Sequence, residues 1–209
     1  MKIKDLNNEI EMILSEKNNI ISTLWSVALM EFNDKIPTAC VVFNKNNGMP
    51  LKYMFNPTFW DSLDNYNRAW IITHETLHII LNHGQRGATY EKTFTQEAIN
   101  TAMDIVINHL TVKSFGFKRD LITNSDNYCW TDTVFKDQLN VSNKLSFGEY
   151  LDIMKDEYYN SQSCPDIHNF GDCEGFSEFL DSVIKDFHGK DALAKTIDEI
   201  RSKLPGNEI

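Results

Sequence analysis

The chain has 209 residues, of which 42% are apolar and 24% are charged. This balance is typical of a globular protein, and at this length a chain can bury a stable core without disulfides or a structural metal. Thirty acidic residues outnumber twenty basic ones, giving a formal net charge of −10, and the basic residues form no cluster. Because such a chain repels phosphate, we expect no nucleic-acid partner.

From the sequence we expect neither an export signal nor a membrane-spanning segment. The N-terminal residues include acidic and amide side chains where a signal peptide needs an apolar run, and no window reaches the roughly 18 apolar residues of a membrane-spanning helix. The four cysteines form no CxxC pair. We therefore expect a cytoplasmic protein with free thiols and no membrane partner.

Two kinds of pattern alternate in the first third of the chain. Apolar residues at helical spacing predict helices within residues 3–32. A β-branched run over residues 36–43 and a second apolar run over residues 51–55 flank an Asn- and Gly-rich turn, which predicts a β-hairpin. A short helix is predicted to follow over residues 58–64.

Two long helices are predicted next. The first extends from about residue 68 to 82, and apolar side chains surround it on most sides, so we expect it to be buried. Gly84 and Gly87 are expected to end it. The second begins after Thr95, a favourable N-cap residue, and extends to Val112.

Helical spacing returns nearer the C-terminus, over residues 147–158 and 176–203. No repeat or linker divides the chain. We therefore expect one mostly helical α+β domain over residues 1–209, with a core at about 36–155 and a C-terminal helical extension over 145–203.

Residues 74–78 read His-Glu-Thr-Leu-His, which is the HExxH pattern. Two histidines four residues apart lie one turn apart on one face of a helix, so both imidazoles can bind one Zn²⁺ ion at about 2.0–2.1 Å. Burying such a polar set without a partner would cost on the order of several kcal/mol. We therefore expect His74 and His78 to bind zinc and Glu75 to act as a general base on a zinc-activated water.

A catalytic zinc ion needs a third protein ligand, and the residues leave two candidates. His83 follows His74 by nine residues, which places it about half a turn out of phase on a straight helix. It can join the site only if the helix breaks after His78. Asp104, on the next predicted helix, is the other candidate.

The surroundings of Asp104 permit two interpretations. Asn100 and Asn108 lie one helical turn before and after it, where their amides could orient a ligating carboxylate. The same three residues could instead form a solvated polar stripe along the helix. Periodicity alone leaves both open.

Several segments resemble a putative metallopeptidase family of bacteria and phages whose members often occur with a von Willebrand A-like domain. The matching residues are Phe55-Asn56-Pro57-Thr58-Phe59, the motif His74-Glu75-Thr76-Leu77-His78 extended by His83 and Arg86, the segment Ala102-Met103-Asp104-Ile105-Val106-Ile107-Asn108 and, more loosely, Leu145-Ser146-Phe147-Gly148-Glu149-Tyr150-Leu151. The resemblance covers about residues 36–155. It implies a zincin-like catalytic core in which Asp104 is a site residue. The chain is too short to add a von Willebrand A-like domain to this core, so a separate partner protein could take its place.

Two further features have weaker interpretations. Arg86 could pair with Asp104 or cap the C-terminal end of the active helix. Cys164, His168 and Cys173 lie close together in the sequence, but their spacing matches no standard zinc site, so we expect a surface loop there.

We therefore predict a zinc metallopeptidase that hydrolyses a peptide or protein substrate, which could bind by strand addition to an exposed edge of the hairpin. One alternative is a non-catalytic metal-binding regulatory or interaction module, such as a phage-encoded factor, with a structural zinc site. A weaker alternative is a metal-dependent hydrolase of a non-peptide amide. Glu75 discriminates against the structural alternative, because a structural site has no use for a general base.

Overall fold

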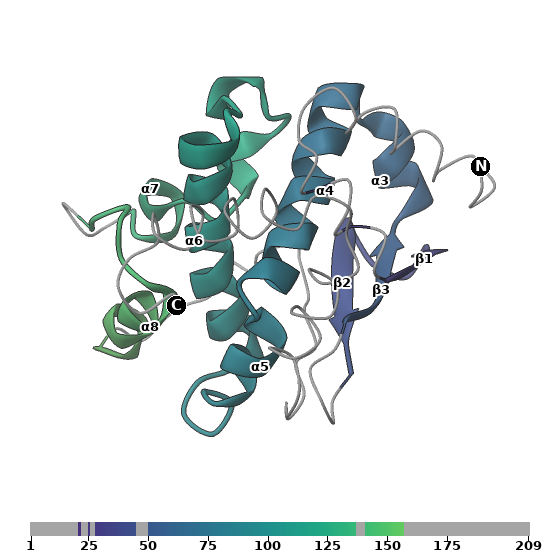
Figure 1. The fold of residues 1–209 in the computed structure, drawn as a ribbon. Coiled ribbons are helices and arrows are strands. Elements are labelled where there is room, and N and C mark those ends of the chain that lie inside the picture. The colour runs from purple at the N-terminus through teal and green to yellow at the C-terminus, as the bar shows by residue number, and fades with distance from the viewer. Residues whose placement is uncertain (1–20, 22–24, 26–27, 45–49, 137–140, 157–209) are drawn as a thin grey trace, which may run out of the picture.

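The computed structural model describes residues 21, 25, 28–44, 50–136 and 141–156, and its class is α+β, as predicted (Figure 1). The predicted helix over residues 176–203 lies outside the described residues, as does most of the helical region expected over residues 3–32. The expectation of one domain over residues 1–209 therefore stays a prediction. In the described part no helix is long and apolar enough to cross a membrane.

Three strands form one sheet in the order β1-β3-β2. Their bounds are β1 Leu29–Phe32, β2 Ala39–Phe43 and β3 Pro50–Phe55. β2 and β3 are antiparallel, which confirms the predicted hairpin, and β3 is the central strand. Its residues Tyr53 and Phe55 are buried, and they contribute to the hydrophobic core together with Val41 of β2.

Strand β1 corrects the expectation of helix up to residue 32. Residues Leu29–Phe32 pair in parallel with β3, in a register that places Leu29 opposite Lys52 and Phe32 opposite Phe55. The helical spacing of the apolar residues is overridden here because the central strand would otherwise leave backbone N–H and C=O groups unpaired on that side. An ion pair of 2.7 Å between Lys52 and Glu31 adds a side-chain contact between the two strands.

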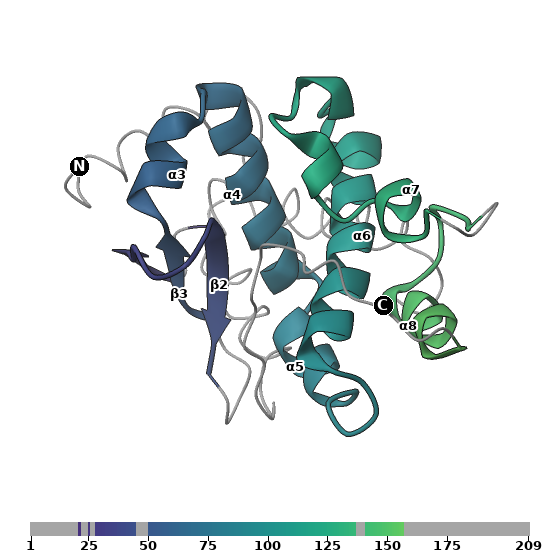
Figure 2. The ribbon, with the colours of Figure 1, turned by 180° about the vertical axis from the view of Figure 1, so that it is seen from behind.

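The described α-helices follow the three strands along the chain. Within the described residues these are α3 Pro57–Ser62, α4 Asn65–Ile80, α5 His83–Ala88, α6 Gln96–Phe115, α7 Thr131–Val134 and α8 Phe147–Asp156, with 3-10 turns η2 Arg119–Leu121 and η3 Ser125–Asn127. Helix α4 contacts β2 on one side and α6 on the other, and α8 packs against α6. Figures 1 and 2 show these layers in the same order from opposite sides, with α4 between the sheet and α6.

Helix α4 is buried, as its apolar periphery predicts. The carboxylate of Asp64 accepts a hydrogen bond of 2.8 Å from the backbone N–H of Asn67 and thereby caps the helix, which starts three residues before the expected position. Every residue from Ala69 to Ile80 is buried. Because the helix packs between the sheet and α6, polar side chains on it meet other protein groups and not solvent.

The end of α4 differs from the expectation. The helix ends at Ile80, and Asn82 adopts a left-handed backbone conformation with φ of 54° before α5 begins at His83. Gly84 and Gly87 therefore lie inside α5 and do not end the preceding helix. Asparagine can take this conformation with little strain, and its Nδ2 here donates to Gln85 Oε1 at 2.6 Å. The helix thus breaks between His78 and His83.

Helix α6 begins as predicted. The hydroxyl of Thr95 accepts a hydrogen bond of 3.2 Å from the backbone N–H of Ala98, which makes Thr95 the N-cap. The helix extends three residues beyond the expected Val112 and ends before Gly116, whose φ of 73° is in the left-handed region that glycine tolerates.

The cysteines in the described residues only partly match the expectation of free thiols. Cys40 is buried in β2 and forms no disulfide. Cys129 is disulfide-bonded, so the expectation is wrong for this residue.

Replacing Asn82 tests the break between α4 and α5. Asn82→Ala should lower the free energy of unfolding by about 1–2 kcal/mol, because alanine pays that cost in the left-handed conformation, and Asn82→Gly should change it by less. Urea denaturation of both variants measures the difference. Asn124, with φ of 55°, supplies a control in which Ala should cost a similar amount. Equal stabilities for the Ala and Gly variants at position 82 would contradict this interpretation.

Candidate metal centre

The two histidines of the motif meet on the buried face of α4. Their Nε2 atoms lie 3.3 Å apart, and both side chains are fully buried, with exposed fractions of 1% or less. The one-turn spacing of His74 and His78 brings this about, because residues four apart project from one side of a helix. Their rings are tilted by 56° to each other, which lets both Nε2 atoms face the same neighbour.

That neighbour is Asp104 of α6. Its Oδ1 lies 3.5 Å from His74 Nε2 and 3.2 Å from His78 Nε2, and its side chain is 2% exposed. The solvated-stripe interpretation of Asp104 is therefore wrong, because α6 turns this residue toward α4. One ligand atom from each of the three residues lies within 4.8 Å of the others, and they form the one such group among the described residues.

The separations among these three atoms agree with tetrahedral metal coordination. Two ligands of a tetrahedral zinc ion, each about 2.0–2.1 Å from the metal, are about 3.3 Å apart. The observed separations are 3.2, 3.3 and 3.5 Å. Two imidazole nitrogens and one carboxylate oxygen are also donor types that Zn²⁺ accepts.

Asn108, one turn after Asp104, determines which ring nitrogen of His74 bears its proton. The Asn108 Nδ2 donates to the carbonyl oxygen of Cys129 at 2.9 Å, so its Oδ1 is the atom that lies 2.9 Å from His74 Nδ1. An amide oxygen only accepts, and Nδ1 must therefore carry the proton. The lone pair of His74 is left on Nε2, the atom that faces Asp104.

Asn108, one of the two asparagines that flank Asp104, thus has a different partner from the one expected. Asn108 contacts the imidazole of His74 and not the carboxylate of Asp104. Asn100 accepts a hydrogen bond of 3.0 Å from Gln96, on its own helix.

His83 lies behind His78. The break at Asn82 turns the chain so that His83 Nδ1 lies 3.0 Å from His78 Nδ1, the ring nitrogen that does not face Asp104. If His78 offers a lone pair at Nε2, its Nδ1 carries the proton and donates to His83. In this arrangement His83 supports the ring of His78 from the side. A direct bond from His83 to a metal stays a prediction.

Glu75 follows His74 directly on α4 and is buried, with an exposed fraction of 1%. The charge of Glu75 acts electrostatically on the phenol of Tyr53 in β3. Burial, the largest cause, raises the pKa of the Tyr53 phenol, the hydrogen bond to Thr76 lowers it, and the negative charge of Glu75 raises it further. The phenol is therefore neutral at physiological pH. Glu75 thus lies within electrostatic reach of a buried hydroxyl group on the central strand.

Arg86 contacts the C-terminal end of α4, which is one of the two interpretations considered for it. Its Nη1 donates to the carbonyl oxygen of Leu81, the C-cap of α4, at 3.4 Å. Its guanidinium also lies over the ring of Phe147 in α8, 4.4 Å from the ring centroid. This side chain therefore joins the end of the motif helix to α8.

Cys164, His168 and Cys173 lie outside the described residues, so the expected surface loop stays a prediction.

His109, next to Asn108 on α6, was not singled out from the sequence. Burial, the largest cause, lowers its pKa to about 4, with Asp132 raising and Arg119 lowering it.

A comparison with family models supports a metal-dependent role. The model described as "Putative metallopeptidase domain" matches residues 3–176. Searches among curated proteins and among solved structures found no match.

Single substitutions of Asp104, His83 and Asn108 should differ in how far they lower the affinity of the protein for zinc. If Asp104 is a ligand, Asp104→Ala should lose more than the 10–100-fold typical for groups that only bond to a ligand, because it would remove a coordinating anion. His83→Ala and Asn108→Ala should fall within that range. Competition with a chromophoric chelator measures each dissociation constant, and thermal unfolding of the metal-free proteins checks that each variant folds. A variant His83→Ala that loses zinc while Asp104→Ala retains it would reverse the assignment.

His109 should stay neutral far below the usual range for histidine. Its pKa is about 4 in the folded chain, whereas an unperturbed histidine has a pKa near 6.5. Between these two pH values the unfolded chain therefore binds a proton at His109 that the folded chain does not bind. Stability from this group is therefore complete above pH 6.5 and falls as the pH decreases toward 4. An NMR titration of the imidazole gives the midpoint directly. A midpoint near 6.5 would contradict the burial assigned to this ring.

Proposed function

The chain belongs to the putative metallopeptidase family, and on that basis we propose that it is a zinc-dependent metallopeptidase with a zincin-like core. The observation that supports the proposal most strongly is the group formed by His74, His78 and Asp104. Its three donor atoms come from two helices and have the spacing of three corners of a tetrahedron. Three protein ligands are the number found in catalytic zinc sites, where the fourth position is kept for water or substrate.

Zinc bound by these residues would polarise a peptide carbonyl and lower the pKa of a water molecule toward 7. The protein's own contribution starts with orientation. Asn108 holds the His74 ring through Nδ1 and His83 contacts Nδ1 of His78, so both Nε2 atoms are directed toward Asp104. Held in place before substrate arrives, these rings need no reorganisation during the reaction.

Glu75 is the group proposed to move protons. It follows His74 directly in the sequence and is buried. As a carboxylate it would accept a proton from the attacking water and pass it to the amine that leaves when the peptide bond breaks.

We propose a peptide or protein as substrate, bound beside the motif helix. β2 forms one side of the described sheet and pairs there only with β3, while α4 contacts it. An extended peptide could add to the other side of β2 by backbone hydrogen bonds. A separate partner protein carrying a von Willebrand A-like domain is a further proposal from the family resemblance.

One observation favours the alternative of a structural metal site. His74, Glu75, His78 and Asp104 are each no more than 1% exposed, which is usual for a closed site that stabilises a fold. The two proposals differ in what they require of Glu75. A structural site has no use for a general base, whereas hydrolysis needs the carboxylate to accept a proton.

Glu75→Gln should separate the two proposals. The amide has the same shape but cannot accept a proton, so turnover of a peptide library should fall by about 10²–10⁴-fold while the variant keeps one zinc per chain. Glu91→Gln, at an exposed position, is the matched control and should retain full activity. Elemental analysis gives the zinc content, and mass spectrometry of the digests gives the turnover.

The outcomes are distinct. Cleavage by the wild type that persists unchanged in Glu75→Gln would contradict the role of Glu75. No cleavage by a fully zinc-loaded wild type would contradict the peptidase proposal and favour a structural site.

A further inference from the structure

We propose that Arg119 is a positioning residue for the metal centre. It lies outside the His74–His78–Asp104 group and acts through the segment of residues 125–133, whose Cys129 carbonyl orients Asn108. The inference rests on the proposed zinc site, because its readout is zinc affinity. It does not depend on peptide hydrolysis.

The first step is the backbone carbonyl of Cys129. It accepts the hydrogen bond of 2.9 Å from Asn108 Nδ2, and this bond decides which way the Asn108 amide is turned. With the amide reversed, an N–H group would face His74 Nδ1, and the imidazole proton would be forced onto Nε2. A proton on Nε2 blocks the lone pair that a metal needs. The position of one carbonyl therefore controls the metal-binding form of His74.

The second step is the fixing of the peptide units on both sides of Cys129. Thr133 Oγ1 donates to the carbonyl oxygen of Tyr128 at 2.6 Å and accepts from the backbone N–H of Trp130 at 2.8 Å. The indole Nε1 of Trp130 donates to the carbonyl oxygen of Ser125 at 2.8 Å. These bonds close a compact turn, so the Cys129 carbonyl can shift only if the turn moves as a whole.

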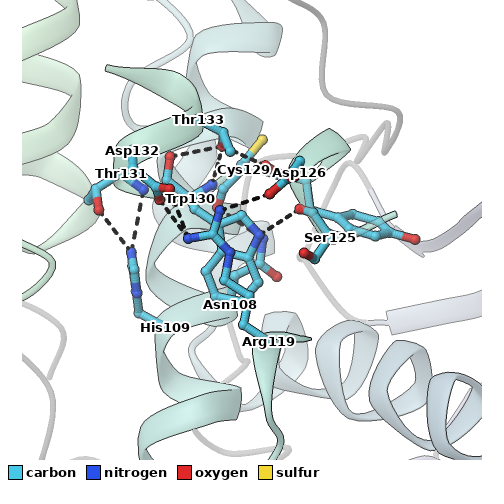
Figure 3. Close-up of polar contacts among 11 residues, drawn as sticks. Asn108, His109, Arg119, Ser125, Asp126, Cys129, Trp130, Thr131, Asp132 and Thr133 are labelled. Carbon is cyan, nitrogen blue, oxygen red and sulfur yellow. Dashed lines mark hydrogen bonds and ion pairs between the residues drawn. The ribbon is translucent and has the colours of Figure 1, made fainter. Parts of the chain in front are cut away.

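The third step is the clamp that Arg119 places on this turn (Figure 3). Its Nη1 bonds both carboxylate oxygens of Asp132, at 2.7 and 2.9 Å, and its Nη2 lies 3.4 Å from Asp126. Its guanidinium carbon lies 4.6 Å from the ring centroid of Trp130. A single side chain thus contacts η3, Trp130 and the start of α7. The planar guanidinium can bond and stack at once, which the ammonium of lysine cannot do in the same way.

A second anchor joins the turn to α6 itself. His109 Nε2 lies 3.2 Å from Thr131 Oγ1 and accepts a bond of 3.4 Å from the Thr131 backbone N–H. Two consecutive residues of α6, Asn108 and His109, therefore hold residues 129 and 131 of the same turn. Figure 3 shows the two contacts between His109 and Thr131. Loss of the Arg119 contacts should therefore first change the orientation of the Asn108 amide.

The test compares Arg119→Met with Lys52→Met. Both side chains are partly exposed, at 31% and 34%, and both form an ion pair of 2.7 Å, but that of Lys52 lies on the sheet. Arg119→Met should weaken zinc binding by about 3- to 10-fold, less than the 10–100-fold expected for a group that bonds a ligand directly. Lys52→Met should leave the zinc dissociation constant unchanged. All proteins are measured in one reducing buffer, so that the disulfide at Cys129 does not hold the turn in the variants.

A double-mutant cycle distinguishes positioning from general destabilisation. In an Asn108→Leu background the amide is absent, and Arg119→Met should then have no further effect on zinc affinity, although it still lowers thermal stability. If Asn108→Leu does not fold, Asn108→Ser replaces it. In addition, ¹⁵N chemical shifts of His74 in the zinc-free protein should show more of the Nε2-protonated form in Arg119→Met than in the wild type.

The inference is overturned by an unchanged dissociation constant in Arg119→Met, by an equal loss in both backgrounds, or by an equal loss in Lys52→Met. These results differ from a failure of the proposed function. A wild type that binds no zinc refutes the metal site itself, and a wild type that binds zinc but cleaves no peptide leaves the positioning result intact.

Discussion

The contact between the Asp104 carboxylate and the imidazoles of His74 and His78 is the constraint on which the rest of the structure depends. All three side chains are buried where α4 packs against α6. If both ring nitrogens direct a lone pair at the acceptor oxygen, the contact is unfavourable without a cation among them, and taking the charge out of water adds to the cost. A bound divalent cation offsets both terms. The helix pair is therefore expected to be most stable when the metal is present, since ligand binding to the folded state stabilises it.

The surrounding elements can be understood as supports for this contact. The sheet packs on α4 from one side, and α6 packs on it from the other, so the motif helix cannot rotate without disturbing both. Behind His78, the turn at Asn82 brings His83 back to the ring. Behind His74, Asn108 reaches the carbonyl of Cys129. Each imidazole is thus held at Nδ1 by a different part of the chain, which is the arrangement that keeps metal ligands in a single tautomer.

Sequence alone was sufficient for the local parts of this arrangement. The His74 and His78 spacing, the apolar surface of α4, the hairpin and the Thr95 cap all depend on neighbours a few residues apart, and such patterns are readable from a single chain. The family resemblance, and not periodicity, favoured Asp104 over a solvated stripe. The parts that sequence missed depend on distant contacts. Strand β1 is a strand because β3 lies beside it, and the pairing of Asn108 with His74 depends on how far α6 is shifted along α4. The helix break at Asn82 is local, but an asparagine signals it far more weakly than the two glycines that follow.

The most direct test of the central claim is X-ray absorption at the zinc K edge of the zinc-loaded wild-type protein, combined with anomalous diffraction from its crystals. The expected result is one zinc ion per chain at about 2.0–2.2 Å from His74 Nε2, His78 Nε2 and a carboxylate oxygen of Asp104. A zinc ion bonded to His83 in place of Asp104, or bound elsewhere on the chain, would contradict the claim that the contact between α4 and α6 is built around a metal.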